Sequence, residues 1–285
     1  MKKTNSHYTT LALIKDEPDR IIPLINNFKK INNLLVLLDH DDILTERVLA
    51  DNSVAYVRRP IEYEKWQQPQ KTQWVIDQSN TKYVFVCYAS FFVPQKLLNL
   101  FDVIAEEQKY DAVKSYVTYY GYGGVVQIPA FLGTPKACHF FNKEKIAVNK
   151  SCIHEEYILL NQAIVLNLPN KKELSLHVFR DDDTIGTVSK HIGYARREAL
   201  ELNRKNEKVN AVTIIYKLIY SFVNNYFRMG GYRFGIKAFI FHMHYFFYQF
   251  MVYSFLWELQ NNCIADKNKE NHIQIKNNLI KEDCK

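Results

Sequence analysis

Acidic side chains follow a short apolar segment near the start of the chain. The run "LLVLL" (34–38) leads directly into "DHDDILTE", which places Asp39 at its end and Asp42 three residues later. A carboxylate at the end of a buried strand can accept hydrogen bonds from a ribose or a nucleobase. Asp residues before a helix are also common N-caps. The residue types alone leave both interpretations open, and capping is the more frequent of the two.

A second cluster lies in the segment "IHEEY", where His154 precedes Glu155. Such a pair could supply a general base or a metal ligand. There is no second His at zinc-binding spacing, which weakens the zinc interpretation. The alternative is the start of a surface helix, because acidic residues favour the first helical turn.

Three cations follow predicted strands or lie close to them in the sequence. Arg58 and Arg59 end the segment "VAYVRRP", and Lys71 follows in "QPQKTQWVIDQS". Cations at strand ends can hold a diphosphate, although solvated surface charge is the commoner role of each residue. The run Asp181–Asp183 could bind a metal, but its place before a predicted helix favours N-capping.

The segment "KYVFVCYASFFVP" (82–94) combines a buried strand with an uncharged end. Its apolar run stops at Tyr88, with Ser90 two residues later and Pro94 beyond. A strand that delivers its carboxyl end to a binding site usually presents charge there, and this one presents a phenol and a hydroxyl.

Apolar strand patterns alternate with helical patterns over the first two-thirds of the chain. Strands are expected at 8–14, 33–39, 54–60, 83–88 and 111–121, and helices at 17–31, 43–51, 68–79 and 94–108. This alternation predicts an α/β fold with a mostly parallel mixed sheet flanked by helices. In such sheets ligands bind at the carboxyl ends of the strands, where Asp39, Arg59 and Tyr88 are expected.

The later part of the chain changes character. A long helix is expected at 182–206, and an amphipathic, aromatic helix pair at 211–260 that breaks at Gly230 and Gly231. Residues 238–257 carry no charge, yet polar side chains recur at helical spacing. Interfacial contact with a membrane, ordinary packing and a true span all remain open. We therefore expect a main domain at 1–209, the helix pair at 210–260 and a disordered tail at 261–285.

Composition narrows the class of protein. The 285 residues carry a net charge of +7, which suits anionic lipid or phosphorylated small molecules as well as nucleic acid. Basic residues do not form a recognised nucleic-acid module, so no nucleic-acid partner is expected. The five cysteines show no CxxC spacing, and no signal-peptide core precedes Lys15, so a cytoplasmic setting is expected. P-loop, GxGxxG, GxSxG and HExxH motifs are absent from the sequence.

The order of these segments resembles family 2 glycosyltransferases of the GT-A fold, especially the bacterial branch that builds lipopolysaccharide cores and similar surface glycans. The resemblance covers roughly residues 8–259. "LIKDE" looks like the opening strand with Asp16 in place of Asn, and "LLDHDDILTE" places Asp39, Asp42 and Thr45 on the Asp, Asp and Thr of the next motif. The further matches are Trp66, Gln70 and Lys71, the pair His154 and Glu155, and the later positions His177, Lys190 and Tyr194. The aromatic helix ending in Trp257 and Glu258 is similar to the usual C-terminal helix of the branch.

The resemblance implies an inverting transfer from a nucleotide-sugar donor to a glycan or glycolipid acceptor at the inner face of the cytoplasmic membrane. Glu155 would be the general base, assisted by His154. Donor contacts would come from Asp16, Asp39, Asp42, Lys71, Tyr88 and Ser90.

The resemblance fails at one motif. The family's central strand ends in Asp-x-Asp, which holds Mg²⁺ or Mn²⁺, and here Tyr88 and Ser90 stand at those positions. Hard cations prefer carboxylates, so a metal cofactor is doubtful. Three alternatives follow: a metal-independent or weakened transferase, an inactive member that binds a nucleotide sugar or a partner enzyme, and a structural protein of the membrane surface.

Overall fold

A computed structural model describes residues 7–14, 18–28, 33–39, 42–65, 68–127, 137–148, 157–180, 182–228, 230–263 and 265–283. The chain divides into two compact units, Met1–Asp182 and Asp183–Lys285. The sequence led us to place the boundary near 209/210. The structure divides the chain earlier because helix α5 (Thr184–Arg204) packs against α7 (Gly235–Gln260), where Ala195 contacts Tyr248 and Val252.

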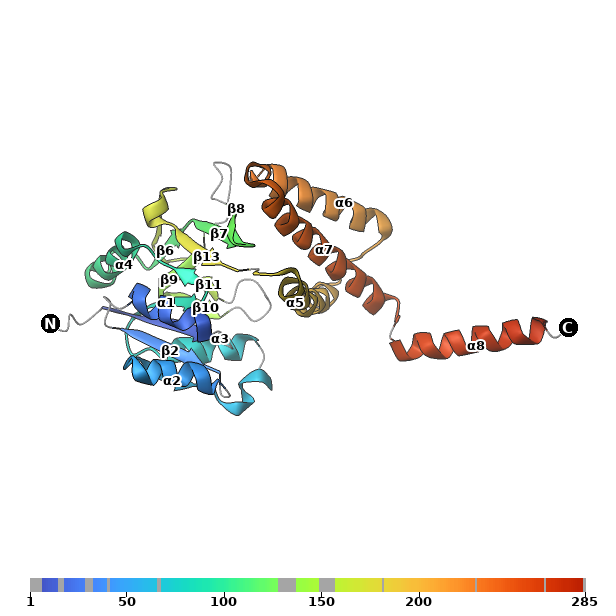
Figure 1. Ribbon diagram of the computed structural model, residues 1–285, viewed down its shortest axis with the longest axis horizontal. Coiled ribbons are helices and arrows are strands. Elements are labelled where there is room, and N and C mark those ends of the chain that lie inside the picture. The colour runs from blue at the N-terminus through green and yellow to red at the C-terminus, as the bar shows by residue number, and fades with distance from the viewer. Residues whose placement is uncertain are drawn as a thin grey trace. The chain divides into compact units, whose positions relative to one another are not determined.

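The first unit is built on a twisted, mainly parallel sheet (Figure 1). Its strands are β1 (Tyr8–Ile14), β2 (Leu34–Leu38), β3 (Ala55–Arg58), β4 (Tyr83–Tyr88), β6 (Ala112–Ser115), β9 (Ala137–Asn142) and β12 (Val165–Asn167). They lie in the order β12-β6-β9-β4-β1-β2-β3, and the pairings of β9 with β4 and β6 are antiparallel. The predicted α/β class, with a mostly parallel mixed sheet flanked by helices, is confirmed.

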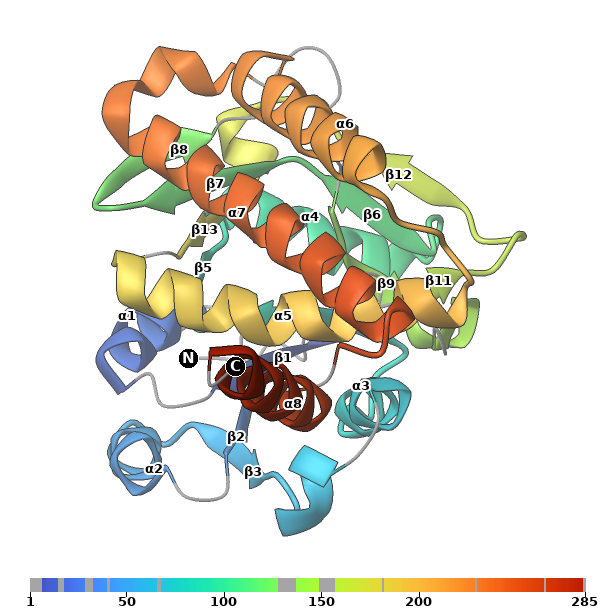
Figure 2. The same cartoon turned by 90° about the vertical axis from the view of Figure 1, so that its right-hand side faces the viewer.

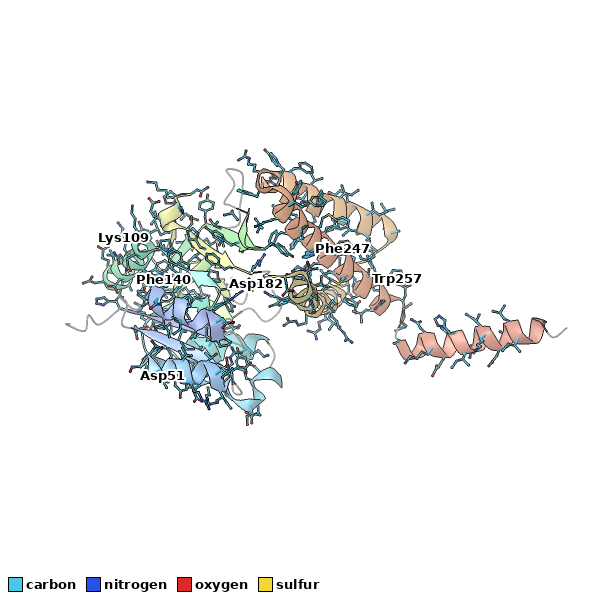
Figure 3. All side chains as sticks on the ribbon, in the orientation of Figure 1. Asp51, Lys109, Phe140, Asp182, Phe247 and Trp257 are labelled. Carbon is cyan, nitrogen blue, oxygen red and sulfur yellow. The ribbon has the colours of Figure 1, made fainter. Side chains whose placement is uncertain are left out.

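Helices cover both faces of this sheet. They are α1 (Pro18–Phe28), α2 (Ile43–Asp51), α3 (Gln68–Asp77) and α4 (Gln95–Glu107), with a 3₁₀ turn η1 (Ile61–Lys65) before α3. Alternate side chains of β4 point to opposite faces, so Phe85 packs with α1 and α4 while Val86 packs with α3. Phe140 of β9, labelled in Figure 3, stacks on Phe101 of α4 with ring centroids 4.4 Å apart. The two apolar layers explain why the central strands read as continuous hydrophobic runs.

A second sheet follows the central strand. It has the order β5-β13-β7-β8, with β5 (Phe91–Phe92), β13 (Leu176–Phe179), β7 (Val117–Gly121) and β8 (Gly124–Gln127). The 3₁₀ turn η3 (Lys172–Leu174) leads into β13. The remaining short elements are η2 (Lys143–Lys145), β10 (Ile146–Val148) and β11 (Tyr157–Leu159). Strand β5 begins one residue after Ser90, so this sheet continues from the end of β4.

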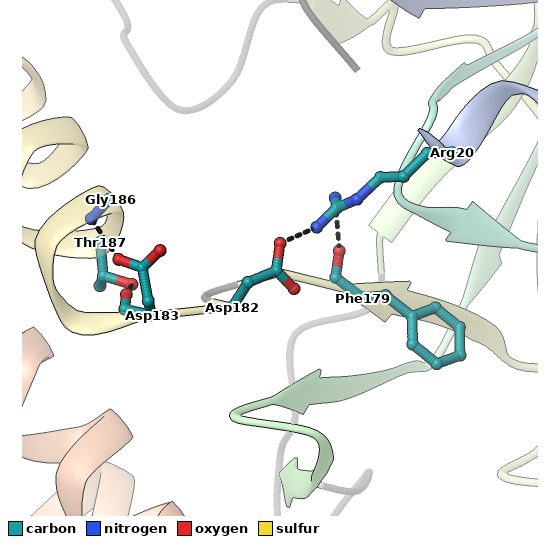
Figure 4. A network of polar contacts seen from close by, with 6 residues as sticks. All are labelled: Arg20, Phe179, Asp182, Asp183, Gly186 and Thr187. Carbon is teal, nitrogen blue, oxygen red and sulfur yellow. Dashed lines mark hydrogen bonds and ion pairs between the residues drawn. The ribbon is translucent and has the colours of Figure 1, made fainter. Parts of the chain in front are cut away.

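The first unit ends in a small polar network (Figure 4). Arg20 of α1 donates to the carbonyl oxygen of Phe179 over 3.1 Å and forms an ion pair with Asp182. The next residue, Asp183, caps α5 by accepting a hydrogen bond from the backbone N–H of Gly186 over 2.6 Å. The N-capping role predicted for this acidic run is confirmed at Asp183.

The second unit consists of helices, seen from another side in Figure 2. After α5 come α6 (Ala211–Phe222), the π-helical η4 (Val223–Arg228), the 3₁₀ turn η5 (Gly231–Phe234), α7 and α8 (Ala265–Asp283). The predicted helix pair and its break are confirmed, with Gly230 at a positive φ of 73°. Helix α8 occupies a segment for which the sequence predicted disorder. Its polar residues include good helix formers, and nearly all of its described side chains are exposed. None of the described helices is both long and apolar enough to cross a membrane.

Candidate functional site

The candidate site lies where the strand order of the sheet reverses. The chain runs from β1 to β2 and β3 on one side, and then crosses to β4 on the other side of β1. Ligands of open α/β sheets bind outside the carboxyl ends of the strands at such a switch point. The register aligns Ile14 of β1 with Leu38 of β2, and Leu38 with Arg58 of β3. Asp39 and Arg59, the residues that follow, are therefore neighbours at this edge.

Arg59 is a buried cation of the site. Its side chain is only 7% exposed, and its Nη2 donates to the carbonyl oxygen of Ile14 over 2.6 Å. Its Nη1 lies 3.9 Å from the Oδ2 of Asp39, which is itself buried. Among the described residues, the Nε of Arg59 has no hydrogen-bond partner. A buried guanidinium that is held by a backbone carbonyl has a fixed position, although its Nε, which is unpaired within the described part of the chain, is itself covered.

An aromatic ring joins a second cation to Arg59. The guanidinium carbon of Arg59 lies 5.1 Å from the ring centroid of Tyr63, and the Nζ of Lys71 lies 5.0 Å from the same centroid. The ring of Tyr63 is held in turn by an edge contact with Trp74, with centroids 5.4 Å apart. The two cations therefore lie close together beside the carboxylate of Asp39, and cations placed in this way can attract an anionic ligand.

The adjacent Arg58 behaves differently. Its guanidinium is exposed and forms an ion pair with Glu46, which also accepts a hydrogen bond from the hydroxyl of Tyr56 over 2.7 Å. The hydrogen bond from Tyr56 and the interaction with Arg58 lower the pKa of Glu46. Arg58 thus has the surface role that the sequence offered as an alternative, and the structure distinguishes it from Arg59.

Asp42 is the N-cap of α2. Its Oδ1 accepts from the backbone N–H of Thr45 over 3.0 Å, and its Oδ2 accepts from the hydroxyl of Thr45 over 2.5 Å. The capping interpretation is therefore confirmed for Asp42, whereas Asp39 faces Arg59. The donor-binding role expected of Asp42 stays a prediction. Asp16, His154 and Glu155 lie outside the described residues.

The end of β4 does not suit a hard divalent cation. The ring of Tyr88 packs edge-on against Phe91 with centroids 5.5 Å apart, and the carbonyl oxygen of Ser90 accepts from the N–H of Phe179 over 2.8 Å. Neither side chain offers a carboxylate, the preferred ligand of Mg²⁺ or Mn²⁺. Within the described ranges, His, Cys, Asp and Glu do not gather in threes that could hold a metal. The residues expected to hold the family's cation do not fit it.

His139 is a residue of the site region that sequence reasoning missed. The pairing of β9 with β6 shifts register between Val113 and Lys114, so β9 carries an extra residue there. The His139 ring contacts Phe91 edge-on at 5.1 Å, and burial lowers its pKa to about 4. Bulges are common beside active sites because they redirect a side chain. No local sequence signal marks this one.

A pocket of about 580 Å³ lies on the second sheet. Its wall includes the rings of Phe92, Tyr120, His177 and Phe179, and Tyr120 stacks on Phe179 with centroids 4.4 Å apart. The His177 Nδ1 lies 3.0 Å from the hydroxyl of Tyr120, and its Nε2 lies 3.3 Å from the carbonyl oxygen of Lys172. One tautomer satisfies both contacts: Nε2–H donates to the carbonyl, and Nδ1 accepts from the hydroxyl. Such a wall can stack against a flat or ring-shaped ligand.

Comparisons with known proteins add little to this geometry. No protein-family model matches the chain, and no curated protein matches its sequence. Among solved structures, a 4-diphosphocytidyl-2C-methyl-D-erythritol synthase is similar over 47% of this chain and 75% of its own, with 12% identity and a TM-score of 0.29. The enzyme of the same name from Anaerococcus prevotii covers 48% and 73%, with 13% identity and a TM-score of 0.30. Similarity at this level does not establish a shared function.

Proposed function

We propose that the chain is a glycosyltransferase that moves a sugar from a nucleotide-sugar donor to a surface glycan or lipopolysaccharide-type acceptor. The observation that carries the proposal is the pair formed by Arg59 and Asp39 at the switch point of the sheet. A buried cation beside a buried carboxylate can bind a diphosphate and a ribose or base together. The order of sequence motifs that resembles family 2 transferases supports the same function.

In this proposal the donor lies across the carboxyl ends of β1, β2 and β4. Asp39 accepts hydrogen bonds from the base or ribose, and Arg59 and Lys71 contact the diphosphate. Asp16, Tyr88 and Ser90 line the remaining donor site, and Asp42 holds the start of α2 beside Asp39. Because the end of β4 lacks carboxylates, the two cations take over the neutralisation of the leaving group that a metal ion would otherwise provide.

The proposed chemical step is a single inverting displacement. Glu155 takes the proton of an acceptor hydroxyl, whose oxygen forms a bond to the anomeric carbon of the donor sugar. The bond between that carbon and the β-phosphate oxygen breaks, and the nucleoside diphosphate leaves with the electron pair. His154 orients Glu155. Both residues belong to the proposal through the resemblance in sequence.

An inactive nucleotide-sugar-binding protein is the second candidate, and the replaced Asp-x-Asp positions Tyr88 and Ser90 favour it. A panel of UDP-, GDP- and CDP-sugars, incubated with a glycolipid extract with and without Mn²⁺, separates the two. Nucleotide release that is lost in Glu155→Gln supports the transferase. Donor binding without turnover under every condition supports the inactive protein, and full activity in Glu155→Gln removes Glu155 as the base.

The proposed place of action is the inner face of the cytoplasmic membrane, where a glycolipid acceptor would be presented. The support is the aromatic, basic helix pair of the second unit, whose α6 and α7 carry many exposed apolar side chains. Phe247 and Trp257 of α7, both labelled in Figure 3, are about half exposed, at 52% and 45%.

A further inference from the structure

Helix α6 leaves many apolar side chains exposed. Six apolar or aromatic residues are between 48% and 76% exposed: Val212, Ile215, Tyr216, Ile219, Tyr220 and Val223. They alternate in steps of three and one, so they form one continuous stripe along α6 that ends at Val223, the first residue of η4. We name these six residues the α6 stripe. On a helix that merely packs in a domain, such a stripe would face the core.

The opposite side of α6 is already used. Leu218 is buried, Ile214 packs in a cluster with Tyr253 and Leu256, and Phe222 contacts Phe239 and Phe246 of α7 edge-on at 6.2 Å. Packing within the unit therefore accounts for Ile214, Leu218 and Phe222, and it does not account for the α6 stripe. An exposed apolar stripe of this length marks an interaction surface.

The turn after α6 adds cations beside exposed apolar side chains. Phe227, Tyr232 and Ile236 are between 50% and 68% exposed. Arg228, Arg233 and Lys237, each one position later in the sequence, are exposed as well. Between 207 and 260 the chain has five basic residues, Lys208, Lys217, Arg228, Arg233 and Lys237. The two acidic residues, Glu207 and Glu258, stand near the ends of this range, and the Oε1 of Glu207 lies 3.8 Å from the Nζ of Lys217.

We propose that the α6 stripe and the adjoining turn dock onto an anionic lipid surface. Apolar side chains enter the boundary between head groups and acyl chains, tyrosines remain at the polar level, and the cations pair with lipid phosphates. A second copy of the chain fits less well, because a two-fold partner would present the same surface, and residues 208–257 contain no acidic side chain to pair with these cations. The inference deepens the proposed function, on which it rests for the acceptor at the membrane.

The test is sedimentation of the full chain with vesicles, in the absence of any donor. One vesicle type contains phosphatidylglycerol with phosphatidylethanolamine, and the other contains phosphatidylcholine alone. The face variant is Ile215→Asn with Ile219→Asn, both residues 58% exposed. The matched control is Ile273→Asn with Ile280→Asn on α8, at 60% and 51%. A third variant combines Arg228→Gln, Arg233→Gln and Lys237→Gln.

We expect binding to the anionic vesicles only, weakened at least about tenfold by the face variant and also weakened by salt and by the charge variant. The α8 control should bind like the wild type. If the face variant does not fold, the charge variant decides on its own. Three outcomes would overturn the inference. The wild type does not bind the vesicles, the α8 control loses as much binding as the face variant, or the chain forms a stable dimer that only the face variant dissociates. Because no donor is present, these outcomes are independent of transferase activity.

Discussion

The guanidinium of Arg59 and the carboxylate of Asp39 lie 3.9 Å apart, at the ends of the neighbouring strands β3 and β2. This separation permits Coulombic attraction but is too long for a hydrogen bond. Arg59 is instead held by the carbonyl oxygen of Ile14, and its Nε has no partner among the described residues. A cation fixed in this way costs little further ordering when an anion binds.

Substitution should distinguish the roles of the two aspartates that follow β2. Asp39→Asn removes the charge beside Arg59, and we expect nucleotide-sugar binding to weaken at least about tenfold. Asp42→Ala removes the N-cap of α2, and we expect about 1 kcal/mol of lost stability with a smaller effect on binding. Calorimetric titration and urea unfolding measure the two effects. The opposite pattern would assign the donor contact to Asp42.

Restoring carboxylates at the end of β4 should change the response to metal. We expect Mn²⁺ to leave donor affinity of the wild type nearly unchanged, and to raise it by about fivefold or more in Tyr88→Asp with Ser90→Asp. Tyr88→Phe with Ser90→Ala is the control for altered packing. A wild type that needs Mn²⁺ to bind the donor would refute the role given to Arg59 and Lys71.

His139 should make the fold sensitive to acid. Its pKa is about 4 in the folded protein because of burial, against an ordinary value of 6.5. Between these values the unfolded chain binds a proton that the folded protein does not, so stability falls as the pH falls from 6.5 toward 4. At about pH 5 this effect lowers the free energy of unfolding by about 2 kcal/mol at most.

Urea unfolding of the wild type and His139→Gln, at about pH 7.5 and about pH 5, checks this prediction. The difference in free energy of unfolding between the wild type and His139→Gln should become smaller, or change sign, at the lower pH. Burial also lowers the pKa of His242 to about 4. His242→Gln is therefore measured separately, to identify the contribution of the second unit. An unchanged gap would mean that His139 is accessible to protons in the folded state.

Two glycines of the second unit should respond in opposite directions to the same substitution. A Cβ at Gly231 would lie 2.4 Å from the Nε2 of His242, which is backed by buried side chains. We expect Gly231→Ala to destabilise the unit by about 1–3 kcal/mol. Gly193 of α5 has open space around it, so Gly193→Ala should stabilise by about 0.5–1 kcal/mol. In a His242→Ala background the penalty at Gly231 should shrink, and a constant penalty would argue against the clash.

Much of the first unit is predictable because its information is local. The apolar runs of β1, β2 and β4 can be read from neighbouring residues, and the structure confirms them. The same holds for the N-cap at Asp183, the first residue of the second unit. The division between the two units at 182/183 was harder to predict from the sequence. It depends on Ala195 and Ala199 packing against α7, which follows them by about fifty residues.

The candidate site also depends on contacts between segments that are distant in the sequence. Sequence placed Arg58 and Arg59 together as candidates for a diphosphate, and only the fold shows one exposed with Glu46 and the other buried beside Asp39. His139 depends on a bulge that forms between two strands, so no single segment encodes it. Burial and register are tertiary properties, and residue types alone do not determine them.

The most direct test of the central claim compares the two adjacent arginines. UDP, GDP and CDP are titrated in the presence of EDTA into the wild type, Arg59→Gln and Arg58→Gln, and the heat of binding is measured. We predict that the wild type binds at least one of them, that Arg59→Gln weakens binding at least about tenfold, and that Arg58→Gln changes it by less than about twofold. Absence of binding to the wild type, or unchanged affinity in Arg59→Gln, would contradict the account.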